Sequence, residues 1–379
     1  MHKKLFGLLV VLLPLQLGRH WWPGWSYLYG LRMDYWAPTL YLTDLLVLGL
    51  IIFSFKFVIL NFKSIINFKF LIVLGLLMVG CWGAGNRAVA FLKLIKILEL
   101  GFLGYYVAKN NWTKEVAARA VIIAVVYSSL IAVGQFVKQG SLGGVFWWLG
   151  ERSFSVATPG IAKLEVSGQL FLRPYGTFGH PNALAGFLLV GWGLTGWWLW
   201  QRGHGLAVSY TVLTGGVIGL TFSRPVWLAG LVILMGVVIQ LIKARNFLFY
   251  GGWLEWESVT RRNELNERAI QLIKEQPLFG VGLNNFLFRL PFTDFVQPVH
   301  NMYLLVASEM GSVVLIIFIV FIIKTIKRNR GDCGLWGGLG TILFTGMFDH
   351  YWLTLQQNQL LLVMVIGLCW QKDKTGAKV

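Results

Sequence analysis

The sequence predicts an all-α, polytopic transmembrane helical bundle, chiefly because of how its charges are distributed. Of the 379 residues, 56% are hydrophobic and 13% are charged, whereas about a quarter of the residues in soluble domains are charged. Six stretches contain no Asp, Glu, Lys or Arg: 70–86, 120–137, 174–201, 206–223, 225–242 and 351–371. About 20 apolar residues cross a bilayer as a helix, which satisfies its own backbone hydrogen bonds in lipid. We therefore expect one integral membrane domain over residues 1–379.

The formal charge of +17 does not indicate a nucleic-acid-binding protein. The Lys and Arg residues fall mainly in short loops between apolar stretches, where positive charge sets membrane orientation. No soluble domain is left to carry a basic face. The three cysteines, Cys81, Cys333 and Cys369, are far apart and lack metal-ligand spacing.

The apolar stretches predict eleven helices, which fits a bundle of about 11–12. We expect them at 5–18, 40–60, 69–85, 88–108, 116–137, 182–201, 206–222, 225–243, 300–323, 334–348 and 355–371. The first helix is expected to be short and uncleaved, because Arg19 to Trp22 is typical of an interfacial belt rather than of a cleavage site.

The basic residues predict which side of the membrane each loop occupies. Lys3 and Lys4 place the N-terminus in the cytoplasm, and further Lys and Arg recur at alternate loops. Arg173, His180 and Arg224 are then extracytoplasmic. Counting back from the basic C-terminal tail also places His300 and the pair Asp349-His350 outside. Counting crossings from the N-terminus places residue 245 inside, whereas counting back from the C-terminal tail places His300 outside. The only apolar stretch between them is 247–254. A thinned or re-entrant crossing, or a lost span, would reconcile the two counts.

Residues 256–299 form the one substantial loop, which this scheme makes extracytoplasmic. Within Thr260 to Glu275, an apolar face recurs at helical spacing and Pro277 ends the pattern; the face is Leu265, Ala269, Leu272 and Ile273. Such an amphipathic helix either lies on the membrane over a site or caps the bundle.

Arg173 and Arg224 are the candidate anion-binding residues. Each borders an apolar stretch and precedes a proline, Pro174 or Pro225, which disfavours helix at the arginine and lets its side chain point into a cavity. A guanidinium binds phosphate through two parallel hydrogen bonds. The alternative is that both side chains reach out to lipid head groups.

His300 is the candidate general base, because a neutral imidazole accepts a proton from a hydroxyl nucleophile; a capping role is the alternative. His180 and His350 are further candidates, each with a structural role as its simpler interpretation. Lys93 lies on one face with Lys96 and Glu99, and it would help to neutralise an anion. Pairing between Lys96 and Glu99 explains those two residues more simply. No metal site is expected, because His-x-x-x-His spacing and a carboxylate-rich cluster are both missing.

Several motifs follow one another in an order that resembles the O-antigen ligase and O-antigen polymerase superfamily of bacterial membrane proteins. They are Arg173 to Asn182, Ser223-Arg224, Pro277 to Gly282 with Asn285-Phe286, His300-Asn301 with Glu309 and Gly311, and Asp349 to Trp352 followed by Gln356-Gln357. The resemblance covers roughly residues 40–371 and is most specific over 170–311, an O-antigen ligase-like core.

The resemblance implies a fold of about twelve transmembrane helices related to the C-type glycosyltransferases, with 256–299 as an extracytoplasmic catalytic loop. It implies transfer of a glycan from undecaprenyl diphosphate to a glycan, lipid or protein acceptor, without metal, cofactor or nucleotide sugar. Arg173 and Arg224 would bind the diphosphate, and His300 would be the base. Lys93, His180, Asn182, Asn301, Asp349 and His350 are possible supporting residues.

The sequence therefore favours a metal-independent glycosyltransferase of the bacterial cytoplasmic membrane that serves polysaccharide biosynthesis in the cell envelope. Ligase and polymerase share these features, so both stay open. The alternative from another class is an anion transporter of the inorganic-carbon type, or a non-catalytic membrane binding protein. The large loop with a histidine at its end favours the enzyme.

Overall fold

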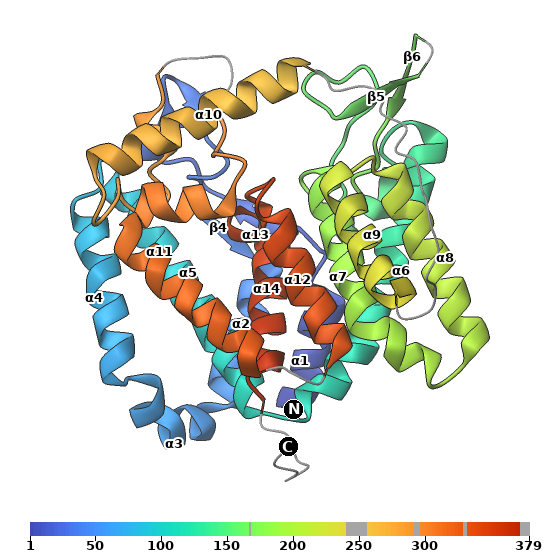
Figure 1. Ribbon diagram of the computed structural model, residues 1–379, viewed down its shortest axis with the longest axis horizontal. Coiled ribbons are helices and arrows are strands. Elements are labelled where there is room, and N and C mark those ends of the chain that lie inside the picture. Colours follow the sequence, from blue (N-terminus) through green and yellow to red (C-terminus); the bar gives the residue numbers. More distant parts are fainter. Residues whose placement is uncertain (167, 240–255, 292–295, 329–331, 372–379) are drawn as a thin grey trace.

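The computed structural model describes residues 1–166, 168–239, 256–291, 296–328 and 332–371. Helices dominate it, and most of them run side by side, roughly across its longest axis (Figure 1). The α-helices are α1 His2–Val11, α2 Leu42–Phe53, α3 Phe55–Ile65, α4 Phe68–Trp82, α5 Arg87–Lys109, α6 Thr113–Lys138, α7 Pro181–Trp200, α8 His204–Leu220, α9 Arg224–Ile239, α10 Trp256–Glu275, α11 Met302–Arg328, α12 Cys333–Thr345, α13 Tyr351–Thr354 and α14 Gln356–Cys369.

Among the described residues, three helices are long and apolar enough to cross a membrane: α6, α7 and α11. A fourth crossing results if α2 and the start of α3 are one span, bent by 67°. Four further apolar helices are shorter: α4, α8, α12 and α14. Large apolar side chains point outward from the bundle, such as Val212 at 68% and Ile316 at 60% exposed. Such side chains suit lipid rather than water, so the class of helical membrane protein agrees with the sequence prediction.

Short strands and 3-10 turns connect the helices, and the sequence pattern did not predict them. Three antiparallel pairs form: β1 Gly18–His20 with β4 Thr39–Tyr41, β2 Tyr27–Leu28 with β3 Leu31–Arg32, and β5 Lys163–Val166 with β6 Gln169–Leu172. The 3-10 turns are η1 Gly24–Ser26, η2 Gly144–Leu149 and η3 Leu287–Arg289. The hairpin β5–β6 and α10 lie at one end of the bundle, and α1 and the C-terminal end of α14 lie toward the other (Figure 1).

Two predicted helices differ from the observed ones. The first helix ends at Val11 rather than residue 18, because Pro14 cannot continue it. The carbonyl oxygen of Pro14 instead accepts hydrogen bonds from Thr177 Oγ1 at 2.6 Å and Gln357 Nε2 at 3.0 Å. The predicted helix 40–60 divides at Ser54 into α2 and α3. The expected crossing at 247–254 lies outside the described residues.

Close helix packing in the core depends on pairs of glycines. A Cβ on Gly367 of α14 would lie 2.6 Å from the carbonyl oxygen of Gly104 of α5. Similarly, a Cβ on Gly334 of α12 would lie 2.7 Å from the carbonyl oxygen of Gly193 of α7. Small residues let helix backbones approach closely, which is how helices associate in lipid without a hydrophobic driving force.

Residues 277–286 fit against a break in α11, and so join the amphipathic helix α10 to a membrane span. Gly311 of α11 has a φ of 80°, and a Cβ there would meet the Leu278 carbonyl oxygen at 2.1 Å. The Glu309 side chain accepts hydrogen bonds from the backbone N–H groups of Asn284 at 2.9 Å and Phe286 at 3.2 Å. The predicted motif Pro277 to Gly282 therefore packs directly against Glu309 and Gly311.

Candidate functional site

A cavity of about 1370 Å³ is lined by Arg262 of α10, by Lys163 at the start of β5 and by residues of α2, α5 and α14. Its wall combines two kinds of polar residue. One set, here called the rim of the cavity, is Arg152, Arg173, His180, Arg262, His300, Asp349 and His350. Within the helices are Asp44, Lys93, Lys96, Glu99, Gln356 and Gln359. Both groups belong to the same cavity, which makes it the best candidate for a functional site.

Arg173 is fixed at the rim by two hydrogen bonds. It follows β6 directly and lies outside any helix, as Pro174 predicts. Its Nε donates to the carbonyl oxygen of Thr221 at 2.7 Å, and one terminal nitrogen donates to Asn182 Oδ1 at 2.7 Å. Thr221 is the C-cap of α8, where a positive charge is favourable because the last carbonyls carry partial negative charge.

Asn182 extends this contact to a buried carboxylate. Its Nδ2 donates to Asp349 Oδ2 at 3.1 Å, and both residues are buried. The backbone N–H of Asn182 donates to Nδ1 of His180, which caps the N-terminus of α7. Pro181 follows in the first turn, where its missing N–H has no consequence. The supporting residues Asn182, His180 and Asp349 therefore lie beside Arg173.

Three histidines and Asp349 meet at the rim. The rings of His300 and His350 have centroids 5.0 Å apart, at 66° to each other. Burial lowers the pKa of His180 and of His350 to about 3, although the nearby Asp349 acts to raise both. Burial likewise lowers the pKa of His300. The three imidazoles are therefore uncharged at neutral pH.

Asp349 keeps its charge beside them. Burial acts to raise the pKa of this carboxyl group, but His300, His350, His180 and the hydrogen bond from Asn182 together hold it below its ordinary value. Its Oδ1 also accepts a hydrogen bond from the backbone N–H of His350 at 2.8 Å.

Arg224 does not line the cavity. It is exposed and is the first residue of α9, so Pro225 does not hold it out of the helix as the sequence pattern predicted. The reason is that proline is well tolerated in the first turn of a helix. The structure thus places Arg173, but not Arg224, beside the histidines.

Sequence reasoning missed three cavity-lining arginines, Arg32, Arg152 and Arg262. Arg262 lies in the second turn of α10 and acts electrostatically on His180, His300 and His350. It precedes the buried face of α10, which includes Leu265, Ala269 and Leu272. The sequence signal for Arg262 was its position three residues before Leu265, which places the two side chains on the same face of the helix. Arg152 Nη1 donates to the Gly179 carbonyl oxygen at 3.4 Å, and nothing in its local sequence marked it.

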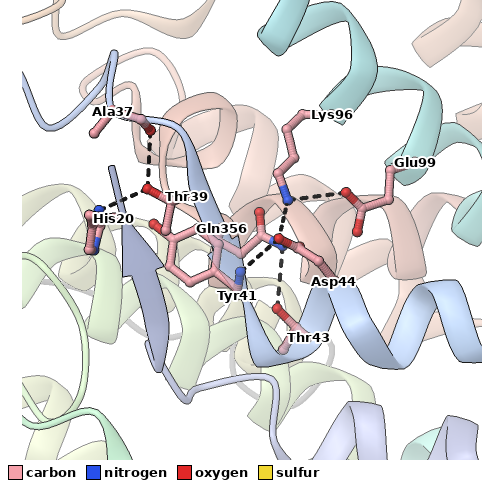
Figure 2. Close-up of polar contacts among 9 residues, drawn as sticks. All are labelled: His20, Ala37, Thr39, Tyr41, Thr43, Asp44, Lys96, Glu99 and Gln356. Carbon is pink, nitrogen blue, oxygen red and sulfur yellow. Dashed lines mark hydrogen bonds and ion pairs between the residues drawn. The ribbon is translucent and has the colours of Figure 1, made fainter. Parts of the chain in front are cut away.

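The charged residues on the helices form an ion-paired cluster, which Figure 2 shows. Lys96 Nζ lies 2.5 Å from Asp44 Oδ2 and 3.1 Å from Glu99 Oε2. Gln356 Nε2 donates to Asp44 Oδ1 at 2.5 Å. The predicted pairing of Lys96 with Glu99 is confirmed, and Asp44 is the third member of the cluster.

Lys93 and Asn301 have mainly structural contacts. Lys93 Nζ donates to the Leu353 carbonyl oxygen at 2.6 Å and interacts electrostatically with Glu309. Asn301 Oδ1 accepts from the backbone N–H groups of Tyr303 at 2.9 Å and Leu304 at 3.1 Å, which caps the start of α11. Lys93 still lines the cavity, so its predicted role toward an anion stays open.

No protein-family model matches the chain, and no curated protein or solved structure matches it either. The functional argument therefore depends on the cavity and on the residues around it.

Proposed function

We propose that this protein is a membrane glycan transferase of the O-antigen ligase or polymerase type, which moves a saccharide from undecaprenyl diphosphate to an acceptor hydroxyl. One observation carries the proposal: Arg173, Arg262 and His300 line the same cavity, although they come from three distant segments. Two guanidinium groups that line the same cavity as an imidazole suit a reaction in which a diphosphate leaves and a hydroxyl loses its proton.

The reaction would proceed as one displacement. The acceptor oxygen forms a bond to the anomeric carbon of the donor sugar, and the bond from that carbon to the diphosphate oxygen breaks with its electron pair. The proton of the acceptor hydroxyl passes to His300. Arg173 and Arg262 stabilise the charge that develops on the leaving diphosphate. Asp349 stabilises the imidazolium that forms beside it.

The distribution of basic residues supports an extracytoplasmic site in the bacterial cytoplasmic membrane. Lys3 of α1 lies over the Trp112 ring, and Arg328, the last residue of α11, lies over the Trp370 ring. Lysine and arginine at helix ends favour the cytoplasmic side. The helix α1 lies at the opposite end of the bundle from α10 and the β5–β6 hairpin, which both contribute residues to the cavity wall (Figure 1).

Replacement of single cavity residues tests the proposal. We expect R173A, R262A and H300A to abolish or strongly reduce the surface glycan ladder in cells that depend on this protein. R224A and R261A are matched controls, because neither Arg224 nor Arg261 lines the cavity. Unchanged glycans in all three cavity variants, at normal protein levels, would contradict the proposal.

The alternative is uptake of an anion through the same cavity. The salt-bridged cluster of Asp44, Lys96 and Glu99 opposes a continuous anion path, since it places two carboxylates along the cavity wall. Uptake of labelled bicarbonate that is lost in R173A, with intact surface glycans, would favour transport instead.

A further inference from the structure

Three side chains that are able to bind a metal converge at the rim of the cavity. Within the part of the chain that the structure describes, His300, Asp349 and His350 form the one such group, and their ligand atoms all lie within 4.8 Å of one another. His300 precedes α11, whereas Asp349 and His350 lie in the turn between α12 and α13. A search for local spacing in the sequence does not detect such a set.

We propose that His300, Asp349 and His350 bind a divalent transition-metal ion of the zinc type. Two imidazoles and one carboxylate are a donor set found in zinc enzymes with an open fourth position. Donor atoms in a tetrahedral zinc site are about 3.3 Å apart, given bonds of about 2.0 Å. Two atoms at the 4.8 Å limit would each move by about 0.75 Å to reach that separation.

The hydrogen bonds around His350 leave one ring nitrogen available as a ligand. The Thr354 hydroxyl can donate to the His350 carbonyl oxygen, 3.2 Å away. In that arrangement the ring Nδ1, 2.8 Å from the same hydroxyl oxygen, donates to it. This tautomer leaves the lone pair on Nε2. A zinc-binding histidine usually donates its other N–H to a fixed oxygen in this way.

Asp349 is oriented in a similar manner. Its two oxygens accept from the His350 backbone N–H and from Asn182 Nδ2, and each oxygen retains a second lone pair for a metal. All three ligand residues line the cavity, which provides a path of entry for the ion.

His180 lies near the group but is not part of the ligand set. Its Nδ1 accepts the hydrogen bond from the Asn182 backbone N–H, so in the neutral ring the proton is on Nε2. Neither nitrogen then offers a lone pair to a metal. This makes His180 the natural control.

The identity of the ion follows from the donors. Mg²⁺ and Ca²⁺ prefer oxygen ligands throughout, so a site with two nitrogens selects zinc or a similar ion. Arg173 and Arg262 line the same cavity and oppose further positive charge. We therefore expect weaker binding than at a structural zinc site.

The consequence for transfer depends on the proposed function. A metal on His300 occupies the lone pair that would accept the acceptor proton, so bound zinc should inhibit glycan transfer. Binding itself does not depend on that function, because the ligands and their geometry stay the same whatever the protein transfers.

Metal binding by the purified full-length protein in detergent tests the site directly. After chelator treatment, equilibrium dialysis with Zn²⁺ alone should reach one ion per chain, and Co²⁺ should give the visible absorption of a tetrahedral complex. H300A, D349N and H350A should each weaken binding at least tenfold, while H180A retains wild-type affinity. Size-exclusion profiles and thermal unfolding of each variant without metal identify any that fail to fold.

The outcomes are distinct. The site is overturned if the wild type binds no zinc at one per chain, or if any folded variant of the three ligands retains wild-type affinity. Zinc should also raise the unfolding temperature of the wild type and H180A, but not that of H300A. If zinc binds as expected and glycan transfer is unaffected, the metal site stands and the role of His300 as base fails.

Discussion

Asn182 donates a hydrogen bond to Asp349 across the rim of the cavity, from Nδ2 to Oδ2 at 3.1 Å. The same side chain accepts one from Arg173 at 2.7 Å. A single amide thus fixes the distance between an arginine proposed to bind the diphosphate and a carboxylate that lies beside the proposed base.

Replacement of Asn182 by alanine should therefore impair both stability and transfer. The N182A variant leaves a buried carboxylate with one donor fewer, which costs about 1 to 3 kcal/mol. Loss of the bridge should also lower glycan transfer by roughly tenfold or more, since a misplacement of 1 Å can cost about 100-fold. Thermal unfolding in detergent and in vitro transfer measure the two effects.

Asn301 provides the matched control, because it caps α11 without contacting Arg173 or Asp349. N301A should cost about 1 kcal/mol, the usual effect of losing an N-cap, and should leave transfer largely intact. Equal loss of transfer in the two variants would show that the bridge has no special role.

The cluster around Lys96 should be sensitive to the loss of its one positive charge. K96A leaves Asp44 and Glu99 in a partly buried site without their ion-pair partner, and we expect destabilisation by about 3 kcal/mol. The exposed pair of Arg119 with Glu115 is the comparison, and R119A should cost less than about 0.5 kcal/mol. Unfolding of the two variants, measured side by side, distinguishes a structural cluster from a surface pair.

Gly311 should not tolerate a side chain. G311A combines a φ of 80° with a Cβ 2.1 Å from the Leu278 carbonyl oxygen, so either the helix or the 277–286 segment must move. We expect destabilisation by at least about 2 kcal/mol. In α12, a Cβ on Gly337 meets nothing within 4 Å, and G337A should be neutral or slightly stabilising. Similar unfolding temperatures for both variants would contradict the close fit.

Asp332 should make stability dependent on pH in acid. Burial acts to raise its pKa, but Lys114 at 2.7 Å and the N–H groups at the start of α12 outweigh burial and lower the pKa below its ordinary value. Because the pKa of Asp332 is lower in the folded state than in the unfolded state, its carboxylate stabilises the fold fully above the unfolded pKa of about 3.9. This stabilisation is lost as the pH falls through the folded pKa. D332A should be less stable than wild type by about 1 kcal/mol at pH 6.

Unfolding of wild type and D332A over a pH series measures this difference. The difference in free energy of unfolding between wild type and D332A should stay constant from about pH 8 to pH 5, and it should disappear as the pH falls below about 4. A gap that instead widens in acid would contradict the assignment.

Most helices could be predicted from the sequence, because charge-free apolar runs leave few alternatives in lipid. The amphipathic helix was predictable too, since Leu265, Ala269 and Leu272 recur at helical spacing and are all buried. The short hairpins were not, because two to four residues per strand are too few for an alternating pattern to show.

The site was predictable only in part, for a similar reason. Arg173, His180 and His300 stood out because ionisable residues at the edges of apolar runs are unusual. Their contacts depend on long-range packing. The hydrogen bond from Asn182 to Asp349 and the ring contact of His300 with His350 join segments that are far apart in the sequence, and no local pattern predicts that these segments meet. Arg262 was inconspicuous because it stands among other charged residues on a helix that was recognised for its apolar face.

The two hydrogen bonds that fix Arg173 have a consequence for affinity. An arginine that must be immobilised by its ligand loses rotational freedom on binding, at about 0.5 to 1.5 kcal/mol for such a side chain. Here the Thr221 carbonyl oxygen and Asn182 already hold the guanidinium in one orientation. The side-chain entropy of Arg173 is therefore lost when the chain folds, and an anion that binds to it would not have to immobilise the guanidinium.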